Sequence, residues 1–267
     1  MINKNLDIKQ CQSILIKMAC EVRAICERHE IPLYMLGGTM LGAIRHKGFI
    51  PWDDDMDFGV PYERYYELMD YLDEELPSRF KAVTYENAKN MQAFFMKVED
   101  KETVVVDIRY DAPIEFQQGL TIDIFPLVRC KREDFEGAVH KIHDVYLLKR
   151  KIFIGSTDRK WYKLWGKRFL KFIVPFSSID LNRKMKRLID NIEPGDWICN
   201  ISSPNFWNRP LPKEYFHPLK KYPFEDTYFL GITDYDSYLK ELYKDYMKLP
   251  SKDKQIVHLD NVFYRNI

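Results

Sequence analysis

Four carboxylates fall within five residues of the stretch "IPWDDDMDFGVP", which covers residues 50–61: Asp53, Asp54, Asp55 and Asp57. Like charges at this spacing repel one another, and a folded chain tolerates them only with water, protons or a cation. Asp55 and Asp57 bracket one apolar residue, so on a strand both side chains point to one face. Carboxylate oxygens suit Mg²⁺ or Mn²⁺. The alternative is an ordinary acidic turn whose side chains bond their own backbone.

A further carboxylate, Asp123, lies among apolar neighbours in "GLTIDIFPL", on an expected interior strand. If that strand lies beside the one that carries Asp57, three carboxylates converge, as in sites that bind one or two divalent ions around a phosphate. Asp55, Asp57 and Asp123 are therefore the candidate catalytic and metal-binding residues. The alternative for Asp123 is a buried cap or an ion pair, for instance with Arg109.

A glycine turn precedes the acids, with fifteen residues between Thr39 and Asp55. Glycines let the backbone approach a ligand closely, and the N-terminus of a following helix favours an anion. Gly37, Gly38 and Thr39 are therefore candidates for binding phosphate, although most glycine pairs are only turns. Basic residues of the same half are candidates for neutralising the remaining charge, with an exposed surface position as the alternative for each: Arg45, His46, Lys97 and Arg109.

Hydrophobic periodicity predicts the elements that must position these residues. In the first half we expect helices over 7–30, from a capping Thr39 to Arg45, and from Pro61 to 76. The expected strands are 34–36, 56–60, 82–85, 94–98, 104–109 and 120–125, the last ending at Pro126. In the second half we expect helices near 133–152, 160–174, 180–191 and 235–248, and irregular structure over 194–233. The pattern predicts a catalytic core over 1–130 and a helical region over 131–267 packed on it, or one continuous domain.

Composition narrows the class of protein. The chain has 267 residues, 46% of them hydrophobic, and a formal net charge of +1, so no global charge attracts nucleic acid. Its five cysteines form no Cys-x-x-Cys or Cys/His cluster, which favours a reducing compartment and no structural zinc. The first residues show no apolar run of the kind found in signal peptides, and no run is long enough for a bilayer. We therefore expect a cytoplasmic protein.

The longer string "GGTMLGAIRHKGFIPWDDDMDFGV" resembles the LicD family of cholinephosphotransferases, which includes fukutin-like proteins. "TIDIFPL" is similar to the family segment that carries the third Asp, and "YLKELYKDYMKLPSKDK" to its C-terminal signature. The chain departs from the family at Lys244 and Ser251, where Gly and Pro are usual. The resemblance implies an α+β fold of the DNA-polymerase-β nucleotidyltransferase type, with a mixed sheet flanked by helices and a mostly helical C-terminal half.

The resemblance also implies an activity. A substituted phosphate would pass from a nucleotide diphosphate donor, such as CDP-choline or a CDP-alditol, to a hydroxyl of teichoic acid, lipopolysaccharide or capsule. Asp55 and Asp57 would hold Mg²⁺ or Mn²⁺ against the donor phosphates, and Asp123 would complete a second metal position or take the acceptor proton. Two alternatives remain: a nucleotidyltransferase with an NTP donor, and a non-catalytic protein that binds glycan or membrane.

Residues 149–187 form a basic belt with thirteen Lys or Arg and two acids. On a helix over 160–174, Trp161, Trp165 and Phe169 share one face, and lysines share the other. We expect this segment to contact an anionic membrane at its inner face, where a lipid-linked glycan acceptor would lie. The alternative is a surface helix that packs its aromatic face on the core.

Overall fold

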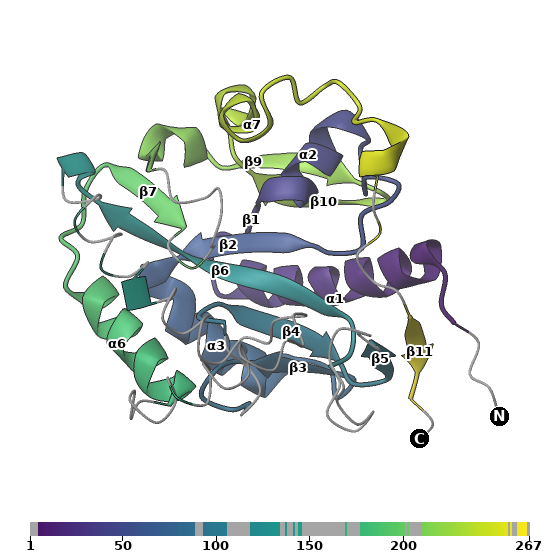
Figure 1. The fold of residues 1–267 in the computed structure, drawn as a ribbon, viewed down its shortest axis with the longest axis horizontal. Helices are drawn as coiled ribbons and strands as arrows, with labels where there is room; N and C mark the ends of the chain where they lie inside the picture. The colour runs from purple at the N-terminus through teal and green to yellow at the C-terminus, as the bar shows by residue number, and fades with distance from the viewer. Residues whose placement is uncertain are drawn as a thin grey trace.

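A mixed sheet runs through the centre of the protein and carries helices on its faces (Figure 1). The computed structural model describes residues 5–88, 93–105, 118–133, 177–200, 210–255 and 261–265, and the single residues 137, 141, 144, 145, 169, 202 and 257. Within them the sheet has the order β3-β4-β6-β2-β1-β10-β9, and β7 and β8 extend it beside the end of β6.

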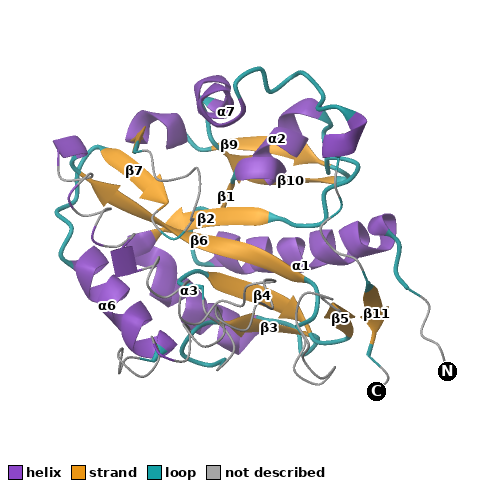
Figure 2. Cartoon of the chain, in the orientation of Figure 1, coloured by secondary structure: helices purple, strands orange, loops and turns teal. Residues whose placement is uncertain are grey.

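The strands of this sheet come from both halves of the chain (Figure 2). Their bounds are β1 (Tyr34–Met35), β2 (Asp57–Pro61), β3 (Phe80–Val83), β4 (Met96–Asp100), β6 (Thr121–Cys130), β7 (Trp197–Asn200), β8 (Leu211–Pro212), β9 (Lys220–Phe224) and β10 (Thr227–Gly231). A second, two-stranded sheet pairs β5 (Thr103–Val105) with β11 (Val262–Tyr264).

The first helix, α1 (Ile8–Arg28), forms as its sequence predicts. Asp7 and Gln10 make a reciprocal capping box, in which the Asp7 carboxylate accepts a hydrogen bond of 2.8 Å from the Gln10 amide. Its apolar positions recur at helical spacing and are buried, so α1 packs against β6, β4 and the next long helix, α3 (Tyr62–Glu75). The predictions for these two helices are confirmed.

The short helix α2 (Gly37–Arg45) starts at Gly37, so the predicted start at Thr39 is wrong. Thr39 does not cap the helix; its hydroxyl accepts a hydrogen bond of 2.8 Å from the amide of Asp57. This bond joins the first turn of α2 to the first residue of β2.

Strand β6 runs straight through Pro126, so the predicted end of this strand is wrong. Pro126 lies beyond Ile124, the last residue paired with β4, and before Leu127, the first paired with β7. On the edge of β6 that faces β4 and β7, Pro126 is paired with neither strand. The N–H that proline lacks therefore removes no hydrogen bond on this edge.

The expectation of irregular structure over 194–233 is also wrong, because β7, β8, β9 and β10 lie there. β9 and β10 form a hairpin, and β10 runs parallel to β1 with Leu230 opposite Tyr34. Helix α6 (Ser178–Asp190) matches its prediction and begins with a capping box at Ser177. The helices predicted over 133–152 and 160–174 lie almost wholly outside the described residues, and the division at residue 130 stays a prediction.

Helix α7 (Tyr235–Tyr243) ends five residues before the predicted limit of 248. The next residue, Lys244, has φ 60° and ψ −109°, a backbone conformation that glycine favours and that no helix continues through. Two short 3-10 helices, η2 (Lys213–Phe216) and η3 (Lys252–Lys254), lie before and after it in the chain.

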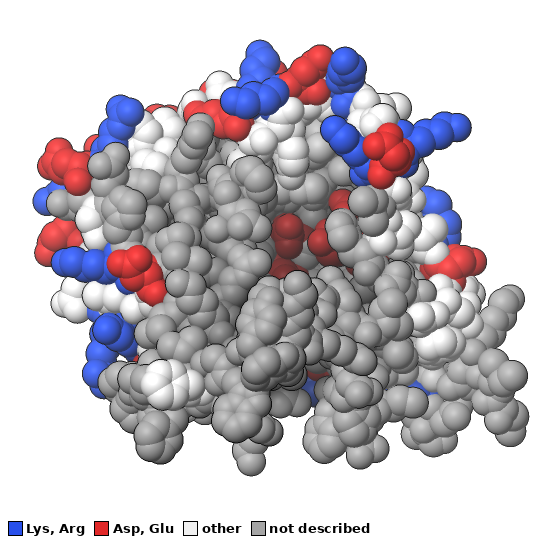
Figure 3. Space-filling model, viewed as in Figure 1, with Lys and Arg blue, Asp and Glu red and all other residues white. Residues whose placement is uncertain are grey.

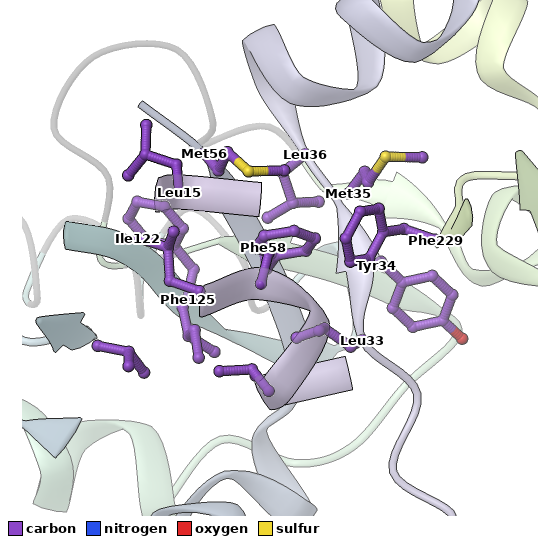
Figure 4. Packing of buried hydrophobic residues seen from close by; sticks show 14 of the residues in the cluster. Leu15, Leu33, Tyr34, Met35, Leu36, Met56, Phe58, Ile122, Phe125 and Phe229 are labelled. Atoms are coloured by element: carbon purple, nitrogen blue, oxygen red, sulfur yellow. The ribbon is translucent and has the colours of Figure 1, made fainter. Parts of the chain in front are cut away.

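The main core joins the two halves of the chain at the centre of the sheet (Figure 4). Phe58 of β2 and Phe229 of β10 are fully buried, with their ring centroids 5.3 Å apart. Met56, Leu15 and Ile122 surround them from the acidic segment, α1 and β6. Burying a large apolar side chain contributes about 1.5–3 kcal/mol, so this packing links β2 to β10, with β1 between them in the sheet.

The turn after α2 is held by the β9–β10 hairpin. The Glu225 carboxylate accepts a hydrogen bond of 3.0 Å from the Phe49 amide, and the Glu225 amide donates one of 2.7 Å to the Lys47 carbonyl. The same turn packs on Gly42, where an added Cβ would lie 2.4 Å from the carbonyl oxygen of Gly48. Only glycine fits at this position.

We therefore expect Gly42→Ala to destabilise the protein by about 1–3 kcal/mol, because the backbone of the turn must shift. The matched control is Gly137→Ala, since a Cβ there meets no heavy atom within 4 Å. Urea unfolding followed by circular dichroism measures both variants. Equal stability of the two would contradict the contact.

Candidate active site

Two carboxylates lie side by side at the centre of the sheet. β2 and β6 are parallel neighbours, and Asp57 is paired in register with Asp123. The pairing is extended by the Asp123 amide, which donates a hydrogen bond of 2.9 Å to the Met56 carbonyl. The predicted adjacency of these two strands is confirmed, and Asp55 lies just before the pair.

Lys97 reaches this pair from the strand on the other side of β6. It lies opposite Asp123 in the β4–β6 ladder, and its Nζ is 2.6 Å from Asp123 Oδ1. Both side chains are about 20% exposed, so little water screens the ion pair. Asp123 therefore forms an ion pair, which was the alternative prediction for this residue, and its partner is Lys97. Arg109, the other candidate partner, lies outside the described residues.

The loop that carries the remaining acids is held from α1. Gln12 is 3% exposed, and its Nε2 donates to the carbonyl oxygens of Asp53 (2.8 Å) and Ile50 (3.4 Å). Within this loop Asp54 is buried and Asp55 is exposed. Sequence reasoning missed Gln12, whose only signal is a polar residue on the apolar face of an amphipathic helix.

Gly38 brings the glycine turn against the acidic loop. A Cβ at Gly38 would lie 2.9 Å from Asp53 Oδ2, so the lack of a side chain lets the loop close on α2. Gly37 has φ 52°, a conformation that favours glycine. Its amide donates a hydrogen bond of 3.0 Å to the hydroxyl of Tyr238, a buried residue of α7. The Gly37 amide and the Thr39 hydroxyl are thus engaged within the protein.

Electrostatic repulsion within the cluster appears in the pKa values of two of its members. Burial, followed by the charges of Asp55, Asp123 and Asp53, holds the pKa of Asp57 well above its usual range, and Lys97 opposes this shift. Burial, followed by the charges of Asp55 and Asp54, raises the pKa of Asp53 to about 8. Both groups therefore favour a proton or another cation beside them.

The chemistry of these residues fits a divalent ion. Carboxylate oxygens are the ligands that Mg²⁺ and Mn²⁺ prefer, and a cation would relieve the repulsion that raises the two pKa values. Among the residues that the structure describes, no three His, Cys, Asp or Glu side chains already converge as a complete ligand set. A divalent ion held here would need these carboxylates to approach one another more closely.

Arg45 and His46, predicted to bind substrate, lie at the end of α2 and make contacts within the protein, and their role toward substrate stays a prediction. Arg45 is the last residue of α2, and its Nη1 donates to the carbonyl oxygens of Tyr246 (2.8 Å) and Lys248 (3.5 Å). The ring of His46 lies edge-on to Trp52, with centroids 6.5 Å apart, and burial followed by the Arg45 charge lowers the pKa of His46. In this structure Arg45 therefore holds the C-terminal segment.

Acidic side chains are visible in a hollow near the centre of one face of the molecule (Figure 3). The residues brought together at the ends of α2, β2 and β6 are Asp53, Asp55, Asp57, Asp123, Lys97, Gly37, Gly38 and Thr39. Sequence reasoning also missed Tyr238 and Tyr243, whose signal is their place in the C-terminal signature.

Comparison with known proteins agrees with this geometry. Residues 30–147 match the family model described as LicD/FKTN/FKRP, nucleotidyltransferase domain. The lipopolysaccharide cholinephosphotransferase LicD of Haemophilus influenzae is 28% identical over 96% of this chain and 97% of its own. An uncharacterized protein of Rickettsia prowazekii is 32% identical over 29% of each chain. A solved structure of the antibiotic-resistance factor ANT(2'')-Ia matches with a TM-score of 0.27 and 14% identity, covering 66% of this chain and 92% of that one.

The matched domain is a nucleotidyltransferase domain. These matches bear out the resemblance of this sequence to the LicD family. The mixed sheet flanked by helices confirms the predicted fold class.

The raised pKa of Asp53 predicts how stability depends on pH without divalent ions. A carboxyl whose folded pKa lies above its unfolded value of about 3.9 stabilises the protein most at low pH. That contribution is lost as pH rises through the folded pKa of about 8. In EDTA we expect the melting temperature to fall from about pH 5 to pH 9, and less steeply in Asp53→Asn. Mg²⁺ should raise the melting temperature most at the alkaline end; a flat profile in EDTA would contradict the assignment.

The backbone of Lys244 predicts a stabilising substitution. A side chain at φ 60° costs about 1–2 kcal/mol relative to glycine, and glycine loses about 0.5–1 kcal/mol more entropy on folding. Lys244→Gly should therefore raise the free energy of unfolding by about 0.5–1 kcal/mol. Lys248→Gly, at a position without positive φ, measures the entropic loss alone and should lower it. If both variants lose stability equally, Lys244 is not strained.

Proposed function

We propose that this chain is a metal-dependent phosphotransferase that moves a substituted phosphate onto a hydroxyl of a cell-surface glycan. Phosphocholine from CDP-choline is the substituent we favour, with lipopolysaccharide, teichoic acid or capsule as the acceptor. The observation that carries the proposal is the placement of Asp57 and Asp123 side by side, with Asp55 before them and the glycine turn packed against them. The relative from Haemophilus influenzae, a lipopolysaccharide cholinephosphotransferase, supports the choice of donor and acceptor.

Phosphoryl transfer asks a protein mainly for positioning and charge neutralisation. Asp55, Asp57 and Asp123 would hold Mg²⁺ or Mn²⁺, which supplies the positive charge that the donor phosphates need. Lys97 would then be released from Asp123 toward a phosphate oxygen. Asp123 is also placed to accept the proton of the acceptor hydroxyl. The start of α2 at Gly37 and Gly38 lies against the acidic loop, and a helix N-terminus favours an anion such as phosphate.

The acceptor glycan concerns a second part of the chain, the basic belt over 149–187. The described part of the chain includes no helix with both the length and the apolar character to cross a bilayer. We propose that the basic belt over 149–187 contacts an anionic membrane that presents a lipid-linked glycan. Most of the belt lies outside the described residues, and Phe169, which is described, is 65% exposed.

Replacing the central carboxylates tests the site. Asp57→Asn and Asp123→Asn keep the side-chain size and remove the charge, so transfer from CDP-choline with Mg²⁺ should fall by at least about 10²-fold. Asp70→Asn changes an exposed acid of α3 and should leave transfer unchanged. Release of CMP, measured beside circular dichroism of the same samples, reports activity per folded protein. Near-normal turnover in Asp57→Asn would exclude the proposed metal site.

The donor class is tested separately with wild-type protein. Melting temperatures are measured with CDP-choline, a CDP-alditol and CTP, each with Mg²⁺ and with EDTA. A shift with CDP-choline that requires Mg²⁺ supports the proposal. A shift only with CTP, with pyrophosphate released during turnover, would instead identify a plain nucleotidyltransferase.

A further inference from the structure

The C-terminal segment from Tyr238 to Tyr246 is fixed to both ends of α2. The Tyr238 hydroxyl accepts a hydrogen bond of 3.0 Å from the amide of Gly37, the first residue of α2. Arg45, the last residue of α2, donates one of 2.8 Å to the Tyr246 carbonyl. The Tyr246 hydroxyl in turn donates a hydrogen bond of 2.9 Å to Asp236 at the start of α7. The residues between these anchors therefore lie along α2.

Tyr243 lies between the two anchors, at the end of α7. It follows Leu239 by four residues, so its side chain leaves the helix beside a fully buried one. It nevertheless stays 40% exposed. After burial, the charges of Asp57, Asp53 and Asp55 are what raise the pKa of Tyr243, while Arg45 opposes them. Tyr243 thus belongs to the segment that is anchored along α2, whose first turn packs against Asp53, and its side chain stays partly exposed.

The residue that follows Tyr243 is strained. Lys244 has φ 60°, and its amide donates a hydrogen bond of 3.0 Å to the Lys240 carbonyl, so the helix ends abruptly at Tyr243. Non-glycine residues persist in such conformations only where the surrounding contacts determine them, and they cluster at functional sites. Here the surrounding contacts are those that Arg45 and Tyr246 make.

We propose that Tyr243 contacts the substrate and donates a hydrogen bond from its phenol to an oxygen of the donor's diphosphate. This inference rests on the proposed function, since it names a further contact in the same site. An ionised carboxylate can only accept hydrogen bonds, so it cannot donate one to a phosphate oxygen. A phosphate bound beside the acidic cluster therefore needs a hydrogen-bond donor from another residue. A phenol, with an ordinary pKa near about 10, keeps its proton at neutral pH and is such a donor. Tyr238 is already engaged by the Gly37 amide, whereas Tyr243, on the same anchored segment, is partly exposed.

The test is Tyr243→Phe, which removes the hydroxyl and keeps the ring. Removing one preorganised donor to developing charge should lower kcat by about 100-fold with little change in KM for CDP-choline. The matched control is Tyr264→Phe, because Tyr264 is also exposed, at 46%, and lies on β11 in the other sheet. Both variants and the wild type are assayed with Mg²⁺ and CDP-choline, and their melting temperatures are measured.

The outcomes separate the two proposals. A selective loss of kcat in Tyr243→Phe, with the melting temperature kept and Tyr264→Phe normal, supports the contact. A wild type that transfers phosphocholine beside an equally active Tyr243→Phe overturns the contact and leaves the proposed function intact. Loss of activity in step with loss of folded protein also overturns it, because the hydroxyl then acts only on stability. A wild type that transfers nothing from any CDP donor overturns both proposals.

Discussion

Two carboxylates, Asp57 and Asp123, lie directly opposite each other on parallel strands in a partly buried site, where burial and the charges of Asp55 and Asp123 raise the pKa of Asp57 and so favour a positive charge nearby. In the free protein that charge comes from Lys97 on one side and from protons that Asp57 and Asp53 favour. Carboxyl groups with strongly raised pKa values are common in active sites. The repulsion in this cluster thus lowers stability at neutral pH, and in the proposed function a bound cation would relieve it.

The remaining structure holds this cluster in place from distant parts of the chain. Gln12 of α1 fixes the acidic loop, and the β9–β10 hairpin fixes the turn after α2 through Glu225. Gly37 and Tyr238 are 201 residues apart in sequence and share a hydrogen bond at the start of α2. Because β10 pairs with β1 and β1 with β2, the C-terminal half extends the sheet on the side next to the strand that carries Asp57. The site is therefore a product of the whole chain.

Local sequence patterns predicted the parts of this fold that depend on local forces. Helical periodicity predicted α1, α3 and α6, and an Asp among apolar residues indicated an interior strand at β6. The same reasoning could not predict pairing between strands that are distant in sequence. Pro126 continues β6 because the strand paired with one edge of β6 changes from β4 to β7 there. Strands form within residues 194–233 because β7 pairs with β6 and β10 pairs with β1. Arg45 was predicted to bind substrate. Its guanidinium donates hydrogen bonds to carbonyl oxygens that only the tertiary fold brings near.

The most direct test of the central claim is a crystal structure with Mn²⁺ and an unreactive CDP-choline analogue, in which anomalous scattering locates the metal. The account predicts Mn²⁺ bound by Asp55, Asp57 and Asp123, touching the donor's diphosphate, with Lys97 moved from its 2.6 Å contact with Asp123. Manganese bound elsewhere, with the Lys97–Asp123 ion pair intact and the donor away from the acidic cluster, would contradict it.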